Sequence, residues 1–304
     1  MILKIIVMLF LLSQNIVYTP FSYPYSPIFT LYFQDQEWSL SLNDVGFDGI
    51  DPTTLDRQAF RSWLHLVVEK EVNHPPKSAT FHNRHIVPHK LGRKVDRKKI
   101  EYWLDHIHEY MDRRLELPII YTKPLITTEK LKKLKEKKLS SYSTIFDEKN
   151  ESRSKNIYLS SKAIDHHILL PGETFSFNKV VGIRSLERGY RIATIIVKGE
   201  YSEGIGGGIC QTSSTLFNSV DQAGLKIIER ISHSKEVAYV PKNRDATVSW
   251  GGPDFRFQNQ LNKPVLIVST VKKGKITIEI FSSKTIRYTP KKVPTPPKSV
   301  LLLN

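Results

Sequence analysis

The feature that most constrains the fold of this 304-residue chain is the sequence Gly-Ile-Gly-Gly-Gly at 204–208. Glycine accepts positive φ angles and close backbone approach, so the run predicts a tight turn or the lining of a cleft. The apolar pattern after it predicts a helix from Cys210 to Ala223, which Gly224 ends as a left-handed cap. We therefore expect a glycine turn that leads directly into one helix in the second half of the chain.

Strand patterns surround this helix. Before it, the segments 169–182 and 190–199 combine apolar residues with glycines, as expected of strands and turns. The last two apolar runs are joined by Lys272-Lys273-Gly274-Lys275, which predicts a hairpin turn. We expect a mostly antiparallel sheet packed on one central helix, with strands after the helix at 227–231, 237–240, 246–250, 255–257, 265–271 and 276–281.

The first half predicts two helices and a few short strands. The alternating pattern from Leu31 to Leu42 indicates a strand, and Ala79–Val87 is compatible with another. Asp96 is a good N-cap for a helix that Pro118 ends. An earlier helix opens at Asp51-Pro52-Thr53, and its buried stripe is predicted to contain Leu55, Ala59, Trp63 and Val67.

These patterns predict an α+β protein with a small N-terminal domain of helices and strands, followed by the sheet domain. We place the two domains at 30–126 and 152–283, with a basic linker at 127–151 that contains a short helix over Thr128–Lys138. Residues 1–27 form an apolar segment and a spacer. Residues 284–304 form a basic, Pro-rich tail that we expect to be disordered.

The N-terminal segment indicates export. One lysine, Lys4, precedes the apolar run 5–12, which has the length of a signal-peptide core and is shorter than the ~20 residues that span a bilayer. A buried N-terminal strand is the alternative. The single cysteine is compatible with an exported protein without disulfides and with a reduced cytosolic one.

The charge balance favours anionic partners. Lys plus Arg number 45 and Asp plus Glu 30, which gives a net charge of +15. For an exported chain this points to peptidoglycan or another anionic wall polymer, and not to nucleic acid. A basic surface can also associate with a membrane surface, and a solvated basic surface without a partner is the alternative. The oligomeric state does not follow from these patterns.

The candidate chemistry centres on Cys210, in the first turn of the predicted helix. A helix N-terminus favours a thiolate and supplies amide groups that can hold an oxyanion. His233 and Asp245 follow it near predicted strands, in the order found in papain-like and transglutaminase-like enzymes. We therefore predict a catalytic triad of Cys210, His233 and Asp245. Alternatively, Cys210 is a small core residue beside Phe217, His233 sits in a turn, and Asp245 caps a turn or pairs with Arg244.

We expect neither a metal nor a cofactor. His82, His85 and His89 lie in a basic loop with no carboxylate among them, and there is no phosphate-binding loop or dinucleotide fingerprint. Substrate binding is assigned to the glycines and to nearby polar side chains, namely Gly206, Gly207, Gly208, Gln211, Ser214 and Arg244.

Three stretches carry a family resemblance. The segment 156–193, then GGGICQTSSTLFNSVDQAGL at 206–225, then HS at 233–234 with YVPKNRDATVSWGGPDFRFQN at 239–259 resemble the VanW-like domain. Upstream, SLSLNDVGF, HIVPHKLGRKVDRKKI and LELPIIYTKPLIT resemble the peptidoglycan-binding domain that often precedes it. The resemblance implies an envelope protein acting near peptidoglycan. Asn243 stands where the family pattern leads us to expect glycine.

Two functions from different classes follow. The first is a peptidoglycan amidase or acyltransferase in which Cys210 attacks a stem-peptide amide, His233 acts as base and then acid, and Asp245 orients the histidine. The second is a non-catalytic module that binds wall polymer through its basic surface, or an accessory protein of an envelope complex of the antibiotic-resistance type.

Overall fold

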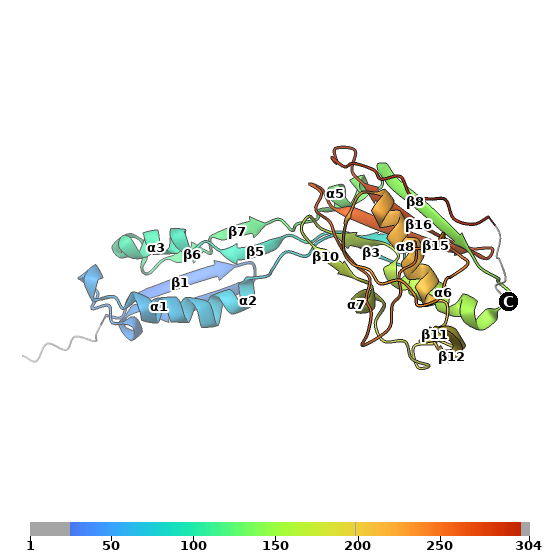
Figure 1. Ribbon diagram of the computed structural model, residues 1–304. Helices are drawn as coiled ribbons and strands as arrows, with labels where there is room; N and C mark the ends of the chain where they lie inside the picture. Colours follow the sequence, from blue (N-terminus) through green and yellow to red (C-terminus); the bar gives the residue numbers. More distant parts are fainter. Residues whose placement is uncertain (1–24, 198, 299–304) are drawn as a thin grey trace, which may run out of the picture. The chain divides into compact units, whose positions relative to one another are not determined.

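The computed structural model describes residues 25–197 and 199–298 and divides into two compact units (Figure 1). The N-terminal unit comprises the chain up to Pro76 together with Leu91–Lys123, and the C-terminal unit comprises Lys77–Lys90 together with the chain from Pro124. The predicted export segment lies mostly outside the described residues. No helix between residues 25 and 298, residue 198 apart, is long and apolar enough to cross a membrane.

Short helices and short sheets build the N-terminal unit. Strand β1 pairs antiparallel with β2 and parallel with β6, and β5 pairs with β7. The strands are β1 (Ile28–Phe33), β2 (Gln36–Ser41), β5 (Gly92–Val95), β6 (Arg114–Glu116) and β7 (Ile119–Thr122). The helical elements are η1 (Leu42–Val45), η2 (Pro52–Thr54), α1 (Arg57–Trp63), the π-helix η3 (Leu64–Glu69), α2 (Lys70–Val72), α3 (Arg97–Asp105) and α4 (Ile107–Tyr110).

The buried stripe of the first long helical run differs from the predicted one. Leu55 is buried and Ala59 and Trp63 are partly buried, but Val67 is exposed. The buried residues recur every four positions, a spacing that drifts around a regular α-helix of 3.6 residues per turn. The π-helix η3 has wider turns and keeps this stripe on one face, which contains Phe60, Leu64, Val68 and Val72.

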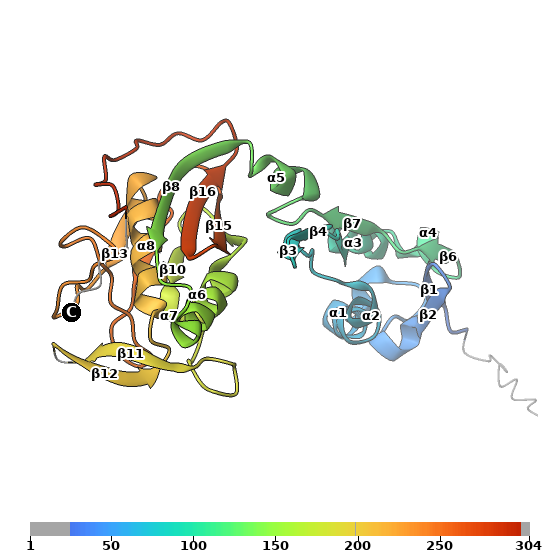
Figure 2. The ribbon, with the colours of Figure 1, turned by 90° about the vertical axis from the view of Figure 1, so that its right-hand side faces the viewer.

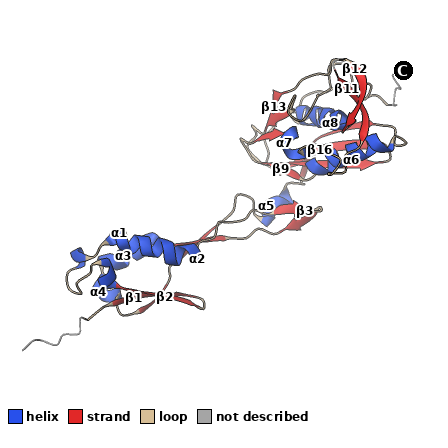
Figure 3. Ribbon diagram, turned by 90° about the horizontal axis from the view of Figure 1, so that it is seen from below, coloured by secondary structure: helices blue, strands red, loops and turns tan. Residues whose placement is uncertain are grey.

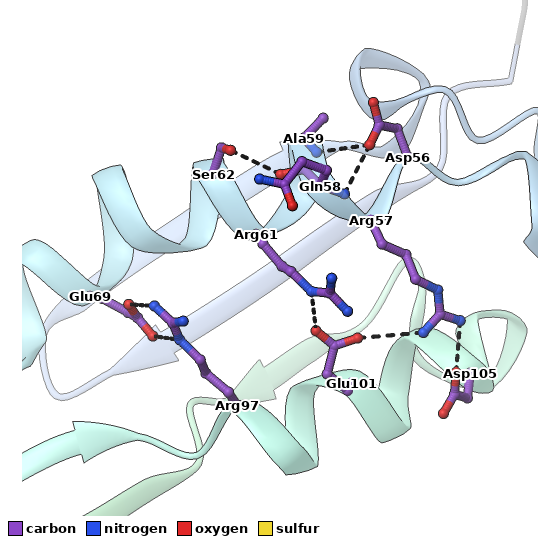
Figure 4. Close-up of polar contacts among 10 residues, drawn as sticks. All are labelled: Asp56, Arg57, Gln58, Ala59, Arg61, Ser62, Glu69, Arg97, Glu101 and Asp105. Carbon is purple, nitrogen blue, oxygen red and sulfur yellow. Dashed lines mark hydrogen bonds and ion pairs between the residues drawn. The ribbon is translucent and has the colours of Figure 1, made fainter.

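Ion pairs join the two main helical segments of this unit (Figure 4). Arg61 of α1 donates to Glu101 of α3 with Nε 2.6 Å from Oε1, and Arg57 reaches Asp105 at 2.7 Å. Glu69 in η3 is buried and receives Nε of Arg97 at 2.6 Å. The hydrogen bonds from Arg97 lower the pKa of Glu69, so this carboxylate is stabilised in its charged form.

A four-stranded antiparallel sheet forms the frame of the C-terminal unit, in the order β8-β16-β15-β9; Figure 2 shows β8, β16 and β15. Strands β15 and β16 form the hairpin predicted around Gly274. The strands of this unit are β3 (Thr80–His82), β4 (His85–Val87), β8 (Lys137–Ile145), β9 (His167–Leu169), β10 (Thr174–Ser176), β11 (Ile192–Val197), β12 (Glu200–Ile205), β13 (Lys226–Glu229), β14 (Arg256–Gln258), β15 (Val265–Lys272) and β16 (Lys275–Ser282). Its helices are α5 (Thr128–Lys133), α6 (Glu151–Ile164), α7 (Phe177–Val181) and α8 (Ile209–Gln222).

Both faces of the four-stranded sheet are covered. Successive side chains of a strand point to opposite faces, and those of β15 pack alternately into two different cores. Val265 and Ile267 of β15 belong to the main core, where α6 and α8 pack on the sheet. Leu266 and Val268 face a smaller core that contains Leu131 of α5. The predicted α+β class, with a mostly antiparallel sheet packed on a helix, is confirmed.

The region predicted as a linker contributes to this frame. Strand β8 is an edge strand of the four-stranded sheet, and α5 packs through Leu131 and Leu134. The tail is ordered over the part that the structure describes, 284–298, and not disordered as expected. Ile286 is buried in the main core, and Lys291 N donates to Gln222 O at 3.0 Å.

Helix α8 is buried along most of its length although it is rich in serine and threonine. Its hydroxyl groups pair with hydroxyl groups on its neighbours: Thr212 with Ser160 of α6 at 2.7 Å, and Thr215 with Thr144 of β8 at 2.8 Å. These short side chains let the helix approach its neighbours closely while the buried polar groups stay satisfied. The helix is thereby fixed against both α6 and the sheet.

The predicted strands at 237–240 and 246–250 are absent from the structure. The backbone at 244–248 instead runs beside α8, whose side chains take the place of a neighbouring strand. Ser213 Oγ donates to Ala246 O at 2.5 Å, and Ala246 N donates to Ser214 Oγ at 2.8 Å. The apolar alternation in the sequence is typical of a strand. It does not indicate whether the backbone hydrogen bonds of the segment go to a neighbouring strand or to side chains.

Candidate active site

The glycine turn is held between a two-stranded ribbon, β11–β12, and helix α6 (Figure 3). A Cβ atom at Gly207 would lie 2.5 Å from Thr194 O of β11, so only glycine fits this backbone approach. Gly206 and Gly208 have φ angles of +92° and +103°, which side chains rarely adopt. The predicted tight turn is therefore present, and the backbone favours glycine at each of its three positions.

Cys210 lies in the first turn of α8, directly after this turn. Its side chain is partly buried against the main core, and Sγ donates to Val248 O at 3.5 Å. The N–H groups of Ile209 and Gln211 donate to Gly206 O and Gly208 O, at 3.1 and 3.0 Å. Cys210 therefore combines two features: its side chain packs against the main core, and it lies in the first turn of the helix.

His233 and Asp245 form a close pair. Nδ1 of His233 lies 2.5 Å from Oδ2 of Asp245, and the same oxygen accepts the backbone N–H of His233 at 2.6 Å. The two side chains are 6% and 9% exposed, so water competes little for this contact. Because Asp245 holds the proton of Nδ1, the other ring nitrogen, Nε2, is the one left for Cys210.

The electrostatics of the pair favour a charged histidine. Burial alone would lower the pKa of His233, but its interactions with Asp245 and Cys210 outweigh burial and raise that pKa to about 9. Burial likewise opposes the charge on Asp245, yet the hydrogen bonds from His233 leave its pKa lowered. The three residues therefore form one coupled group, with an imidazolium at neutral pH.

Cys210 and His233 line one cleft of about 1040 Å³. The glycine turn, the ribbon β11–β12 and the segment around Trp250 form its walls. Asp245 lies outside this lining, beside a neighbouring cavity of about 310 Å³ that His233 also borders. The arrangement presents a thiol and an imidazole to a cleft, with the carboxylate behind the imidazole.

Of the six residues assigned to substrate binding, four line the cleft and two do not. Gly206, Gly207 and Gly208 line the cleft. Gln211 also lines it, but its side chain is 1% exposed and bonds to Arg153 and Thr144.

Ser214 and Arg244 do not line the cleft. Ser214 Oγ is buried and bonds to Cys210 O and Ala246 N. Arg244 bonds to Asn218 and Asp221, and Asn243 before it has φ +61°, so this turn keeps the left-handed backbone that glycine favours.

The sequence does not single out several cleft residues. Arg184, Arg153, Tyr239 and Thr247 all line the cleft. Burial and the nearby Cys210 raise the pKa of Tyr239, which keeps its phenol protonated. An arginine in a loop or a tyrosine after a histidine has no fixed spacing from a cysteine, so no sequence signal reveals them.

His82, His85 and His89, the histidines considered as metal ligands, do not share one site. His82 and His85 face each other across the β3–β4 hairpin, while Nδ1 of His89 lies 2.8 Å from Thr128 Oγ1. Among residues 25–197 and 199–298, no cluster of three His, Cys, Asp or Glu side chains is placed to hold a metal ion.

Comparisons with known proteins agree on one family. The family described as VanW like protein matches residues 152–281. The uncharacterized protein YoaR of Bacillus subtilis (strain 168) is 44% identical over 247 residues, which cover 81% of this chain and 82% of that protein. The vancomycin B-type resistance protein VanW of Enterococcus faecalis (strain ATCC 700802 / V583) is 30% identical over 139 residues, which cover 44% of this chain and 50% of that protein. No solved structure matches the chain.

The chain therefore belongs to the VanW family, as its motifs predict. Cys210, His233 and Asp245 all fall inside the matched region. The resemblance of the N-terminal unit to a peptidoglycan-binding domain stays a prediction.

Proposed function

We propose that this protein is an acyl-transfer enzyme of the cell envelope that uses Cys210 as its nucleophile. The observation that carries the proposal is the pair of His233 and Asp245, joined at 2.5 Å, with His233 lining the same cleft as Cys210. A buried carboxylate that orients an imidazole next to a thiol is the arrangement that nucleophilic catalysis requires.

His233 already carries a proton on Nε2 at neutral pH, so the thiol of Cys210 gives its proton to solvent, and the reactive form is the ion pair of thiolate and imidazolium. Asp245 stabilises the charge of this imidazolium through Nδ1. In the resting structure the thiol bonds to Val248 O. A substrate amide in the cleft would draw Sγ from this carbonyl toward the histidine.

The thiolate then attacks the amide carbonyl carbon and forms a C–S bond, while the carbonyl electron pair moves to oxygen. We assign the N–H of Cys210 itself to this oxyanion, because the N–H groups on either side are already bonded within the turn. When the oxyanion collapses, the C–N bond breaks and Nε2 of His233 protonates the leaving amine. A thioester remains on Cys210.

The thioester reacts with water or with an amine. Neutral His233 accepts a proton from this second nucleophile, the C–S bond breaks, and Cys210 leaves as a thiolate. Water gives hydrolysis and an amine gives transfer to a new peptide. Both are reactions of an amidase or acyltransferase on stem peptides of peptidoglycan, which is the substrate that we propose.

Three observations support the cell envelope as the setting. The chain belongs to the VanW family, and one relative is named a vancomycin resistance protein. The net charge of +15 suits anionic wall polymers. Residues 1–12 have the composition of a signal-peptide core, and we propose that the protein is exported.

The test is cleavage or transfer of isolated peptidoglycan stem peptides, followed by mass spectrometry of the protein. We expect product formation with the wild type and a thioester adduct on the chain's single cysteine. Cys210→Ser keeps the size of the side chain and should reduce the rate by at least about 100-fold. Full activity of this variant would show that Cys210 is not the nucleophile.

The charge balance favours a second candidate, a non-catalytic module that binds wall polymer. It predicts that the protein binds purified cell wall, that salt weakens the binding, and that Cys210→Ala leaves the binding unchanged. Binding without any turnover of stem peptides would favour this candidate over the enzyme.

A further inference from the structure

Two buried polar atoms in the cleft have no hydrogen-bond partner. The described residues contain three such side-chain atoms, and two of them are Nη1 of Arg184 and Oγ1 of Thr247. Both residues line the cleft that holds Cys210. Buried donors without a partner cost free energy, so their concentration in one cleft points to a ligand that supplies acceptors.

Only one of the two terminal nitrogens of the Arg184 guanidinium has a hydrogen-bond partner. Its Nη2 donates to Asn178 Oδ1 at 2.8 Å, and the amide nitrogen of Asn178 is fixed in turn by Ser249 O and Pro253 O. The stem of Arg184 lies along Gly206, where a Cβ atom would come within 3.4 Å of it. The fold therefore orients the guanidinium beside the glycine turn and leaves Nη1 without a partner.

The negative charge of Asp254 lies near Arg184, but Asp254 forms no ion pair with it. Among the described residues, no carboxylate forms an ion pair with it. The nearby Asp254 is occupied by Ser176 Oγ at 2.5 Å and Asn178 N at 2.8 Å. A second cation, Arg153, also lines the cleft, whereas Glu236 pairs with Lys242 at 2.5 Å. Nη1 of Arg184 can therefore bind an anion in the cleft, and a guanidinium binds carboxylates as well as phosphates.

Thr247 lies in the segment that bonds to the thiol. It directly precedes Val248, whose carbonyl oxygen accepts a hydrogen bond from Cys210 Sγ. The backbone N–H of Thr247 donates to Ile231 O at 2.7 Å. Its hydroxyl is therefore the group that it can offer to the cleft. Arg184 therefore lies beside the glycine turn that leads into Cys210, and Thr247 is the neighbour of the residue whose carbonyl oxygen accepts Cys210 Sγ.

We propose that Arg184 determines specificity by binding a free carboxylate of the substrate next to the amide that Cys210 attacks, with Thr247 donating a further hydrogen bond. The inference rests on the proposed function and names its substrate class: peptides with a carboxylate beside the scissile bond. That carboxylate is either the α-carboxylate of a terminal residue or a side-chain carboxylate.

The test is protection of Cys210 from alkylation by iodoacetamide, which needs no turnover. The probes are N-acetylalanine, which carries an α-carboxylate, the α-amide of N-acetylglutamate, which carries only a side-chain carboxylate, and the uncharged N-acetylalaninamide. The ratio of alkylation rates with and without each probe is measured for every variant. We expect one or both carboxylates to slow alkylation at least about tenfold more than the amide does at equal concentration.

Arg184→Gln should remove this difference, Arg184→Lys should keep part of it, and Thr247→Val should weaken it. Arg191→Gln is the matched control, because Arg191 is a nearby exposed arginine outside the cleft lining. Equal protection by carboxylates and amide in the wild type, or no protection by either, would overturn the proposal whatever the variants do. The proposed function would fail separately, if His233→Ala left the unprotected alkylation rate unchanged.

Discussion

A single carboxylate oxygen, Oδ2 of Asp245, accepts both the ring Nδ1–H and the backbone N–H of His233, at 2.5 and 2.6 Å. The imidazole is thereby fixed in position as well as in protonation state. Since side chain and backbone are held by the same atom, loss of this carboxylate should disturb the histidine more than loss of one hydrogen bond would.

The pair should make stability depend on pH. The pKa of His233 is raised from 6.5 to about 9 in the folded protein, so its contribution is fully present below pH 6.5 and is lost as pH rises through 9. The shift corresponds to a contribution on the order of 3 kcal/mol. Urea unfolding of the wild type and of His233→Asn should show the largest difference in unfolding free energy near pH 5 to 6, shrinking by pH ~9. A difference that grows with pH would contradict the assignment.

Amide cleavage should decline at alkaline pH. His233 must be protonated to donate to the leaving amine, so kcat/KM is expected to fall as pH rises through about 9. Asp245→Asn removes an interaction that raises this pKa, and should move the alkaline limb of the profile to lower pH. An alkaline limb at the same pH in both proteins would mean that Asp245 does not act on His233.

The glycine turn should tolerate no side chain at its middle position. In Gly207→Ala the added Cβ meets backbone atoms of Ala193 and Thr194 at 2.5–2.6 Å, which cannot move without displacing β11. We expect a loss of about 1–3 kcal/mol in unfolding free energy and slower alkylation of Cys210. Gly204→Ala is the control, because its Cβ would meet the movable side chain of Ile195 instead. Equal effects of the two substitutions would contradict this account of the turn.

The N-terminal unit should depend on Glu69. The hydrogen bonds from Arg97 lower the pKa of this buried carboxylate, so its contribution is present above pH 4.5 and is lost as pH falls. Glu69→Gln keeps the shape but removes the charge, and should cost about 1–3 kcal/mol in the unfolding free energy of this unit at pH 7. The alkylation rate of Cys210 is expected to stay unchanged, and a change would show that the two units are energetically coupled.

Much of the second half follows from its sequence because its signals are local. The hairpin around Gly274, helix α8 and the glycine turn are each determined by residues within a few positions of one another. The absent strands at 237–250 show the limit. Their apolar residues are typical of a strand, but the hydrogen-bond partners come from Ser213 and Ser214 of α8, at a distance in sequence that no local pattern encodes.

The candidate site shows the same division. Cys210 and His233 can be chosen by residue type and order, because a thiol at a helix start and a following histidine are recognisable. Arg184 cannot, since its significance lies in an unpartnered buried nitrogen. Arg244 is predicted to bind substrate; its side chain contacts Asn218 and Asp221 of α8, and the binding role stays a prediction.

The central claim is that His233 and Asp245 activate Cys210, and the rate of Cys210 alkylation by iodoacetamide at pH 7 tests it most directly. Because the chain has one cysteine, the reaction reports a single site. We expect the folded wild type to react at least about tenfold faster than His233→Ala, with Asp245→Asn in between. A wild-type thiol that reacts only on unfolding, or at the same rate in all three folded proteins, would make Cys210 a core residue and contradict the account.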